Sequence, residues 1–286
     1  MHDVISMKSI AKQLNDWTYT DYYYRLMLIA RSVFKWNNLP NGINEKWIER
    51  YLFNEGNCLF YRDKEKGFMI AKCTQSGSLN YYDEATTLTP YGTGYMGKPL
   101  QNYDECVLIQ NNDLCLSTSP TIQLFAYRLA DIQRTIDVNI SAQKTPVVVL
   151  CSDKQKLSIK RAMQQVTDNE IAVYGDKTLD VDGIKALKID APVVFDKLYT
   201  QKQNVWNECM TFLGINNNSQ EAKRERLVVN EVEANNEQIE ASAEVFLKSR
   251  QDACERINKL FGLNISVEMR QMETPTLEDF EGGTNE

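Results

Sequence analysis

Histidine is almost absent from this chain of 286 residues, in which the sole example is His2. A Ser-His-Asp or Cys-His catalytic centre, like a zinc site with imidazole ligands, needs a histidine that a folded segment holds in place. A residue beside the amino terminus is poorly suited to that task. The sequence therefore argues against these classes, and we predict no catalytic residue, no metal and no cofactor.

Paired cysteines are also missing. The total of seven is odd and no C-x-x-C occurs, which fits reduced thiols in a cytoplasm better than a disulfide framework. We expect these side chains to act as small hydrophobic residues. They are Cys58, Cys73, Cys106, Cys115, Cys151, Cys209 and Cys254.

Recognisable nucleotide-binding motifs are scarce. No G-x-x-x-x-G-K-[ST] is present, so the chain has no visible motor for nucleotide hydrolysis. YGTGYMG at Tyr91–Gly97 matches G-x-G-x-x-G, but Pro99 follows it at a point where a dinucleotide site needs the start of a helix. We predict a strand connection there, and a hairpin turn rather than a metal site at Asn111–Asp113.

Long apolar runs and a dominant positive charge are lacking too. LMLIA at Leu26–Ala30 is far shorter than the roughly 20 residues of a membrane span, and no signal-peptide pattern begins the chain. The net charge of −7 gives no overall attraction for nucleic acid or an anionic membrane. We therefore expect a soluble intracellular product in which any contact with DNA is local.

What is present is a succession of helical and strand-like patterns. An aromatic-rich helical pattern runs from Lys8 to Trp36 and ends at WNNLP, and a short helix is expected from Asn44 to Phe53. Short apolar or alternating runs from Cys58 to Leu116 predict antiparallel strands of a small sheet or barrel.

Long helices dominate the rest. The first has Ser119 as its cap and ends before Pro146, about 36 Å later. Its apolar positions recur at spacings of three and four, at Ile122, Phe125, Leu129, Ile132, Ile136 and Ile140.

A small α/β insertion is expected at Pro146–Ile189, with a short helix at Leu157–Val166. A second long helix runs from about Pro192 to Gly214, and a third from Asn235 or Asn236 to Gly262. The strand ISVEMR and an acidic tail follow.

The second long helix carries apolar side chains over about half of its circumference, more than one partner helix needs. We expect it to pack on two sides, with Lys202 in the apolar half reaching solvent or an acidic partner. The opposite arc, most simply a solvated face, contains Asp196, Lys197, Thr200, Gln203, Asn204, Asn207 and Glu208.

The segment Leu213–Ser242 is long and polar for a connection between two helices, with KRER (Lys223–Arg226) at its centre. Loops of this length are usually functional or disordered. Taken alone, KRER fits a solubilising loop, although a loop held between packed helices would carry these charges to one defined place.

Several sequence blocks resemble, in order and spacing, the portal protein of small short-tailed bacteriophages (podoviruses) of Gram-positive hosts, also called the upper collar or head-tail connector. The resemblance covers roughly Leu14 to Met269. The blocks are WNNLP, QNND, TSPTIQLFAYRLA, VNISAQKTPV, KIDAPVVFDKL, QKQNVWNECMTFLG and NEQIEASAEVFLKSRQDACERIN.

The resemblance implies an α+β, predominantly helical portal fold, with long stem helices, a small α/β clip, and a wing containing helices and a small antiparallel sheet or barrel. The implied regions are a wing at 1–118, a first stem helix at 119–145, a clip at 146–189, a second stem helix at 190–216, a tunnel loop at 217–234, and a wing or crown helix, strand and acidic tail at 235–286.

The resemblance further implies a dodecameric ring at one vertex of the virion capsid. The ring is the channel for packaging and ejection of double-stranded DNA and has no enzymatic activity. Its implied partners are copies of itself, DNA in any sequence, the major capsid protein, a transient packaging ATPase and the lower collar or tail proteins, with no membrane. Assembly is expected in the host cytoplasm.

Basic residues are implied to line the channel, where repetition around a ring turns each into a belt of positive charge in an otherwise acidic tube. They are Lys188, Lys197, Lys223 and Arg224. The tunnel loop, a candidate clamp against DNA slippage, includes Asn217, Asn218, Glu221, Lys223, Arg224 and Arg226.

Two other classes of protein remain as alternatives. A tail adaptor or lower collar ring would also form an oligomer, but would lack the order of long helix, clip, long helix and tunnel loop. An enzyme acting on DNA is disfavoured because the motor motif and a catalytic histidine are absent.

Overall fold

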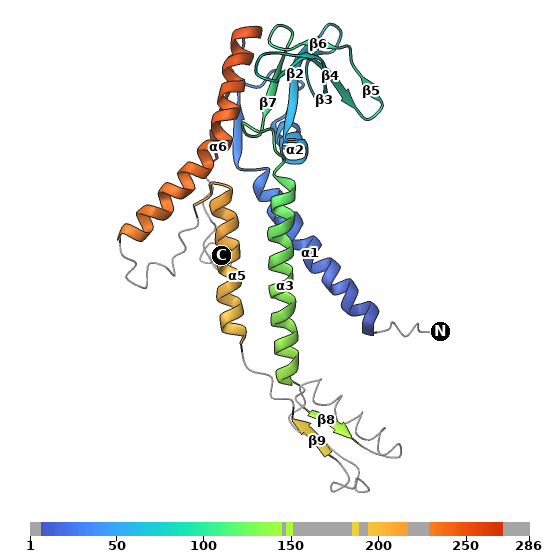
Figure 1. The fold of residues 1–286 in the computed structure, drawn as a ribbon, viewed down its shortest axis with the longest axis vertical. Helices are drawn as coiled ribbons and strands as arrows, with labels where there is room; N and C mark the ends of the chain where they lie inside the picture. Colours follow the sequence, from blue (N-terminus) through green and yellow to red (C-terminus); the bar gives the residue numbers. More distant parts are fainter. Residues whose placement is uncertain (1–6, 145–146, 151–184, 189–193, 217–228, 271–286) are drawn as a thin grey trace, which may run out of the picture. The chain divides into compact units, whose positions relative to one another are not determined.

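The computed structural model describes residues 7–144, 147–150, 185–188, 194–216 and 229–270 (Figure 1). The chain divides into two compact units. The first combines Met1–Thr20 with Tyr127–Val205, and the second combines Asp21–Ala126 with Trp206–Glu286. Three helices pass from one unit into the other: α1 (Met7–Ala30), α3 (Ser119–Lys144) and α5 (Phe195–Phe212).

The second unit contains the antiparallel sheet that the sequence predicts between Cys58 and Leu116 (Figure 1). The strand order is β5-β4-β3-β2-β7, and β6 pairs with β4. Apolar side chains from these strands, including Leu59, Ala71, Leu88 and Leu108, form a buried core. The strands are β2 (Asn57–Asp63), β3 (Gly67–Leu79), β4 (Ala85–Gly92), β5 (Tyr95–Met96), β6 (Leu100–Gln101) and β7 (Cys106–Gln110).

Two predicted turns have different outcomes. The glycine-rich segment is a strand connection, as predicted, because Gly94 (φ 72°) forms the turn between β4 and β5. The prediction of a hairpin turn at Asn111–Asp113 was wrong, since these residues lead from β7 into α3 and join no two strands. The Asn112 side chain closes this turn by accepting hydrogen bonds from the backbone N–H groups of Leu114 and Leu116.

Helix α2 (Glu45–Glu55) confirms the short helix predicted from Asn44. The Asn44 side chain caps its first turn by accepting a hydrogen bond from the Lys46 N–H, at 3.0 Å. Gly56 ends the helix at φ 79°, and a Cβ atom there would lie 1.9 Å from the Cys115 carbonyl oxygen. Glycine is therefore required at this position both by backbone conformation and by space.

The helix predicted to continue to Trp36 instead ends at Ala30. Residues Phe34–Asn37 form a strand, β1, that pairs antiparallel with β10 (Ser266–Met269). Phe34 and Trp36 are buried while Lys35 between them is exposed, which is the alternation of a strand. The aromatic content of this segment fits either structure, and the deciding partner lies more than two hundred residues away.

Helix α6 (Val229–Phe261) ends before Gly262, as predicted, but it starts earlier than the predicted Asn235. Residues 229–234 lack an apolar period, yet glutamate and alanine favour helices. The segment between α5 and α6 that lies outside the described residues is therefore 217–228. Farther along, Ile239, Ala253 and Ile257 are buried, and α6 packs against β7 and β10.

Helices α3 and α5 confirm the two long helices predicted on either side of the insertion. Ile122, Phe125, Leu129 and Ile136 of α3 are buried as expected, whereas Ile140 is exposed. Within the insertion, β8 (Val147–Leu150) pairs antiparallel with β9 (Lys185–Lys188). The helix predicted at Leu157–Val166 lies outside the described residues.

The cysteines that the structure describes are free thiols. Burial raises the pKa of Cys73 to about 11 and that of Cys106 to about 12. Both therefore stay protonated at neutral pH and act as small packing residues. Among the described residues, no helix combines the length and the apolar character that crossing a bilayer requires.

Gly56 and Gly67 provide a test of this fold. Both have φ near 78°, at 79° and 77°, but a Cβ atom at Gly67 meets nothing within 4 Å. We expect Gly67→Ala to cost about 1–2 kcal/mol of unfolding free energy through backbone conformation alone. Gly56→Ala should cost at least about 2 kcal/mol more, because the added methyl group would also overlap the Cys115 carbonyl oxygen. Equal urea midpoints for the two variants would contradict the close approach of Gly56 to Cys115.

Candidate functional site

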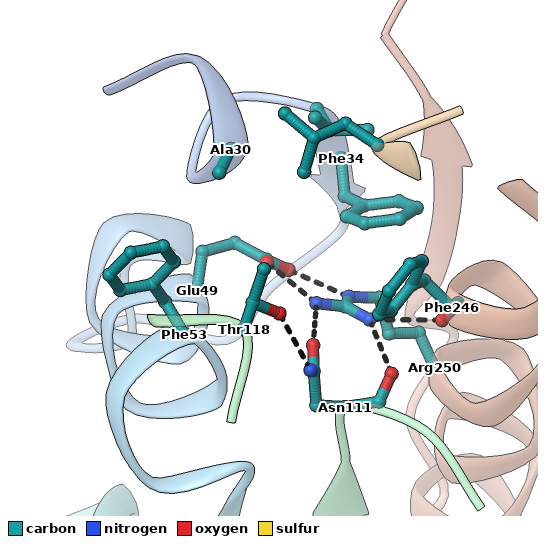
Figure 2. Close-up of a pocket in the computed structure, with 10 residues that line it drawn as sticks. Ala30, Phe34, Glu49, Phe53, Asn111, Thr118, Phe246 and Arg250 are labelled. Carbon is teal, nitrogen blue, oxygen red and sulfur yellow. Dashed lines mark hydrogen bonds and ion pairs between the residues drawn. The ribbon is translucent and has the colours of Figure 1, made fainter. Parts of the chain in front are cut away.

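The second unit contains a buried guanidinium, that of Arg250 (Figure 2). Arg250 projects from α6 and meets Glu49 of α2 in a two-pronged ion pair, with Nε–Oε1 at 3.0 Å and Nη2–Oε2 at 2.8 Å. It also donates to Asn111, to Oδ1 at 3.1 Å and to the backbone oxygen at 3.2 Å, and to the Phe246 oxygen at 2.9 Å. These bonds use all five N–H donors of an arginine.

The partners of Arg250 are themselves held by further bonds. Glu49 Oε1 accepts a hydrogen bond from Trp36 Nε1, at 2.9 Å. Asn111 Nδ2 donates to Thr118 Oγ1 at 2.9 Å, which fixes the orientation of the amide. The Phe34 ring lies under the guanidinium, with 4.1 Å between its centroid and the Arg250 Cζ.

This cluster joins segments that are far apart in the sequence: β1, α2, the turn after β7 and α6. We call Arg250, Glu49 and Asn111 the hub. A cavity of about 20 Å³ beside it is large enough for one water molecule and no substrate. The charged groups of Arg250 and Glu49 are fully engaged by bonds within the cluster, so neither side chain is available for chemistry. The hub therefore acts by positioning the elements around it.

Packing around the hub holds the ends of the long helices that lie in the second unit. The rings of Phe125, Phe212 and Phe246 form a chain from α3 through α5 to α6, with centroid separations of 6.2 and 5.7 Å. At the end of α5, a Cβ atom on Gly214 would lie 2.5 Å from the Cβ of Ala243. The glycine thus lets α6 cross close to the end of α5.

In the first unit, a polar network links α1, α3 and α5. Lys202, which was predicted to reach solvent or an acidic partner, is partly buried and donates to the Gln133 Oε1 at 2.7 Å. Gln133 in turn donates to Asp137, and Asp137 pairs with Arg134 at 2.8 Å. Arg134 also donates to Asn15 of α1 at 2.9 Å. Lys202 is therefore linked to the carboxylate of Asp137 through the side-chain amide of Gln133.

The polar arc of α5 is the candidate channel face. Lys197 is exposed on it beside Asp196 and Thr200. Val205, Cys209 and Leu213 lie outside the polar arc and are buried, as predicted for the apolar half. Tyr199 also lies outside the polar arc but keeps 54% of its surface exposed, so this chain by itself does not cover the apolar half completely.

The other predicted channel residues are placed only in part. Lys188 is the last residue of β9, opposite Val147 of β8. Lys223 and Arg224 lie outside the described residues, together with the remaining tunnel-loop residues Asn217, Asn218, Glu221 and Arg226. The assignment of these residues to a DNA channel therefore stays a prediction.

The helices of the first unit expose large apolar side chains. The exposed fractions are 66% for Trp17 of α1, and 64% and 62% for Tyr127 and Val138 of α3. With Tyr199, such side chains occur on three helices of one unit. These exposed apolar side chains are available for a contact with another protein.

Sequence reasoning missed the hub. One signal was available: Phe246, Arg250, Ala253 and Ile257 follow one another at spacings of four, three and four, so an arginine stands in the apolar stripe of α6. A charge at such a position needs a buried partner. The sequence gives no sign, however, that the partner is Glu49, which is 201 residues away.

Removing one charge of the hub should be far more damaging than removing a surface charge of the same helix. Glu49→Gln leaves Arg250 buried without its counter-charge, and we expect a loss of about 3–5 kcal/mol in unfolding free energy. Glu45→Gln is the matched control, because its pair with Arg270 is exposed and should contribute less than about 1 kcal/mol. Urea unfolding followed by tryptophan fluorescence measures both, and similar midpoints would exclude a central role for the hub.

Comparison with known proteins gives consistent results. Residues 4–273 match the family model described as Phage Connector (GP10). A chain in the solved portal and tail of native bacteriophage P68 is 16% identical, with a TM-score of 0.55, and the match covers 99% of this chain and 96% of that one. An HK97-family phage portal protein from Corynebacterium diphtheriae is 9% identical, with a TM-score of 0.45 and coverage of 93% and 95%.

Proposed function

The chain belongs to the phage connector family and is a head-tail connector of a bacteriophage, and on that premise we propose that it forms a closed ring at one capsid vertex. The ring is the conduit through which double-stranded DNA enters during packaging and leaves during ejection. This proposal rests on the family match over residues 4–273, which is nearly the whole chain. The family is structural rather than enzymatic.

The exposed apolar side chains of the first unit support ring formation. A ring built by head-to-tail contacts uses two different surfaces of each subunit. Helices that serve both their own subunit and a neighbour need a wider apolar face than one packed pair, which explains the exposure of Trp17, Tyr127 and Tyr199. We propose twelve subunits, a podovirus of a Gram-positive host, and location in the virion after assembly in the host cytoplasm.

We assign the regions of the ring as the sequence analysis expects them. The sheet, α2 and most of α6 belong to the wing, α3 and α5 are stem helices, and β8 with β9 belongs to the clip. The packaging ATPase and later the lower collar or tail proteins dock at the clip, and the wing meets the major capsid protein. The order of α3, β8–β9 and α5 favours a portal over a lower collar ring.

The channel face of α5 suits a duplex that must slide. Each phosphate contact adds affinity that depends on salt and not on sequence, so a wholly basic tube would retard the DNA. With a net charge of −7 and only a few basic belts, such as the one from Lys197, the ring centres the duplex without holding it. The tunnel loop then acts as a clamp against backward slippage.

Ring formation is tested by negative-stain electron microscopy of the purified chain, with end-on views classified by rotational symmetry. We expect twelvefold rings with a central hole wide enough for duplex DNA. The double variant Tyr127→Glu with Val138→Glu should raise the concentration for half-assembly roughly ten-fold or more, because it places charges in an apolar contact. Gln201→Glu, an exposed polar position on α5, is the control. A wild-type protein that stays monomeric with and without capsid protein would disprove the ring.

The tunnel loop is tested by replacing residues 217–228 with a short Gly-Ser linker, which leaves α6 complete from Val229. Because the replacement leaves the hub residues Arg250, Glu49 and Asn111 unchanged, rings should assemble as in the wild type. Particles carrying this variant should package DNA but lose it before tail attachment, as measured by nuclease-protected genome length. Full-length protected genomes would show that the segment is no clamp.

A further inference from the structure

Helix α2 and the residue after α1 carry a group of cations around an exposed tryptophan. Lys46 Nζ lies 5.4 Å and Arg50 Cζ lies 5.2 Å from the Trp47 ring centroid, and all three side chains are exposed. Because Arg50 follows Lys46 by four positions and Trp47 by three, the three side chains share one face of the helix. Arg31 lies beside this face, since its Nη2 donates to the Lys46 backbone oxygen at 3.3 Å. We call Arg31, Lys46, Trp47 and Arg50 the basic patch.

The carboxylates of α2 do not neutralise these cations. Each of them pairs with a cation from another part of the chain: Glu45 with Arg270, Glu49 with Arg250, and Glu55 with Lys72. The three cations of the basic patch make no ion pair with any carboxylate in the described part of the chain. The patch therefore carries positive charge that the described residues leave uncompensated.

Arg31 shows the effect of this surplus charge. Burial, and after it the positive charge of Arg50, lower the pKa of the Arg31 guanidinium, which the carboxylate of Glu49 offsets only in part. The Arg31 Nε atom is buried and has no hydrogen-bond partner among the described residues. Buried donors are usually paired, and leaving a charged one unpaired costs more than leaving a neutral one. The basic patch is thus suited to a partner that brings carboxylates.

The last described residue of the chain lies beside this patch. The backbone N–H of Arg270 donates to the Val33 oxygen at 2.7 Å, and its Nε donates to the Ser32 oxygen at 3.1 Å. Its Nη2 lies 2.9 Å from Oε1 of Glu45, in the first turn of α2. The chain therefore leaves the described structure next to residues that adjoin two members of the basic patch in sequence.

The residues that follow have the charge that the patch lacks. Residues 271–286, QMETPTLEDFEGGTNE, contain five carboxylate side chains and no lysine or arginine, and we call them the acidic tail. The Cα atom of Glu273 lies at most about 11 Å from that of Arg270, and the Cα atom of Glu278 at most about 29 Å. Arg50 is five residues beyond Glu45, which is about 7.5 Å along the helix. The whole patch is therefore within reach of the tail.

A tethered occupant also has an advantage in concentration. A segment joined to its site by a few flexible residues has an effective concentration in the millimolar range. A free anionic partner must reach a comparable concentration to displace it. Proximity and charge thus favour the acidic tail of the same chain over a separate molecule.

We infer that the acidic tail folds back onto the basic patch of its own chain. Carboxylates within residues 273–281 meet Arg31, Lys46 and Arg50, while Leu277 and Phe280 supply apolar surface for Trp47. A bound tail neutralises this face of α2 and leaves no unpaired positive charge there for another polyanion. The inference does not depend on the proposed ring, because every residue in it belongs to the second unit of one chain.

Carbodiimide cross-linking of the full chain tests this contact, because the reagent joins an amine directly to a carboxylate. At low salt, mass spectrometry should find Lys46 joined to carboxylates of residues 271–286. In an equal mixture of ¹⁵N-labelled and unlabelled chains, combined before assembly, the joined peptides should carry one isotope only. Salt at about 1 M should lower the yield roughly three-fold or more, because the Debye length falls to about 3 Å.

The variant Arg50→Gln separates attraction from mere tethering. Arg50 is exposed over the Trp47 ring, so the substitution removes a charge without opening the core. The yield of the Lys46 cross-link should fall roughly three-fold or more, because less positive charge holds the tail. Arg62→Gln is the matched control: Arg62 is also exposed over a ring, with Cζ 5.5 Å from the Phe68 centroid, and its loss should leave the yield unchanged.

Three outcomes contradict the inference. One is the absence of cross-links between Lys46 and the tail, and another is a yield that neither salt nor Arg50→Gln changes. The third is joined peptides of which half carry both isotopes, which would place the tail of a second copy on the patch. A chain that gives the expected cross-links but forms no ring refutes the proposed function and leaves this contact in place.

Discussion

The second unit depends on one buried ion pair. Arg250 and Glu49 join α6 to α2, and Asn111 adds the turn from which α3 begins. Such a pair costs desolvation energy when it is built, so its presence is a weak argument for high stability. Its geometry is the stronger argument, because a planar fork with five occupied donors accepts very few arrangements of the surrounding segments. The pair therefore specifies the fold more than it strengthens it.

That specification is important for a connector. The long helices expose apolar side chains such as Tyr127, Val138 and Tyr199, which the proposed ring would cover with a neighbouring subunit. In the proposed ring the directions of these helices must be set before assembly, since a ring closes only when every contact repeats the same rotation. The hub, the chain of phenylalanine rings and the close crossing at Gly214 place the ends of α3, α5 and α6 within one rigid arrangement.

The charges on the polar face of α5 fit the proposed channel. On the polar face of α5 the charges are mixed and sparse, which suits a surface past which a polyanion moves. On the proposed function, the chain meets DNA through a local pattern of basic residues, and its net charge of −7 keeps the overall attraction for the duplex low.

Local periodicity was enough to determine much of this protein. The spacing of Ile122, Phe125 and Leu129 predicted α3, and short alternating runs predicted the antiparallel sheet, because burial on one face leaves a repeating signal in neighbouring residues. Resemblance, rather than any pattern, supplied the channel residues. Tertiary structure alone decided that Phe34 and Trp36 form a strand, and that Arg250 meets Glu49. Both depend on partners more than two hundred residues away, and the periodicity of one segment does not identify its partner in another.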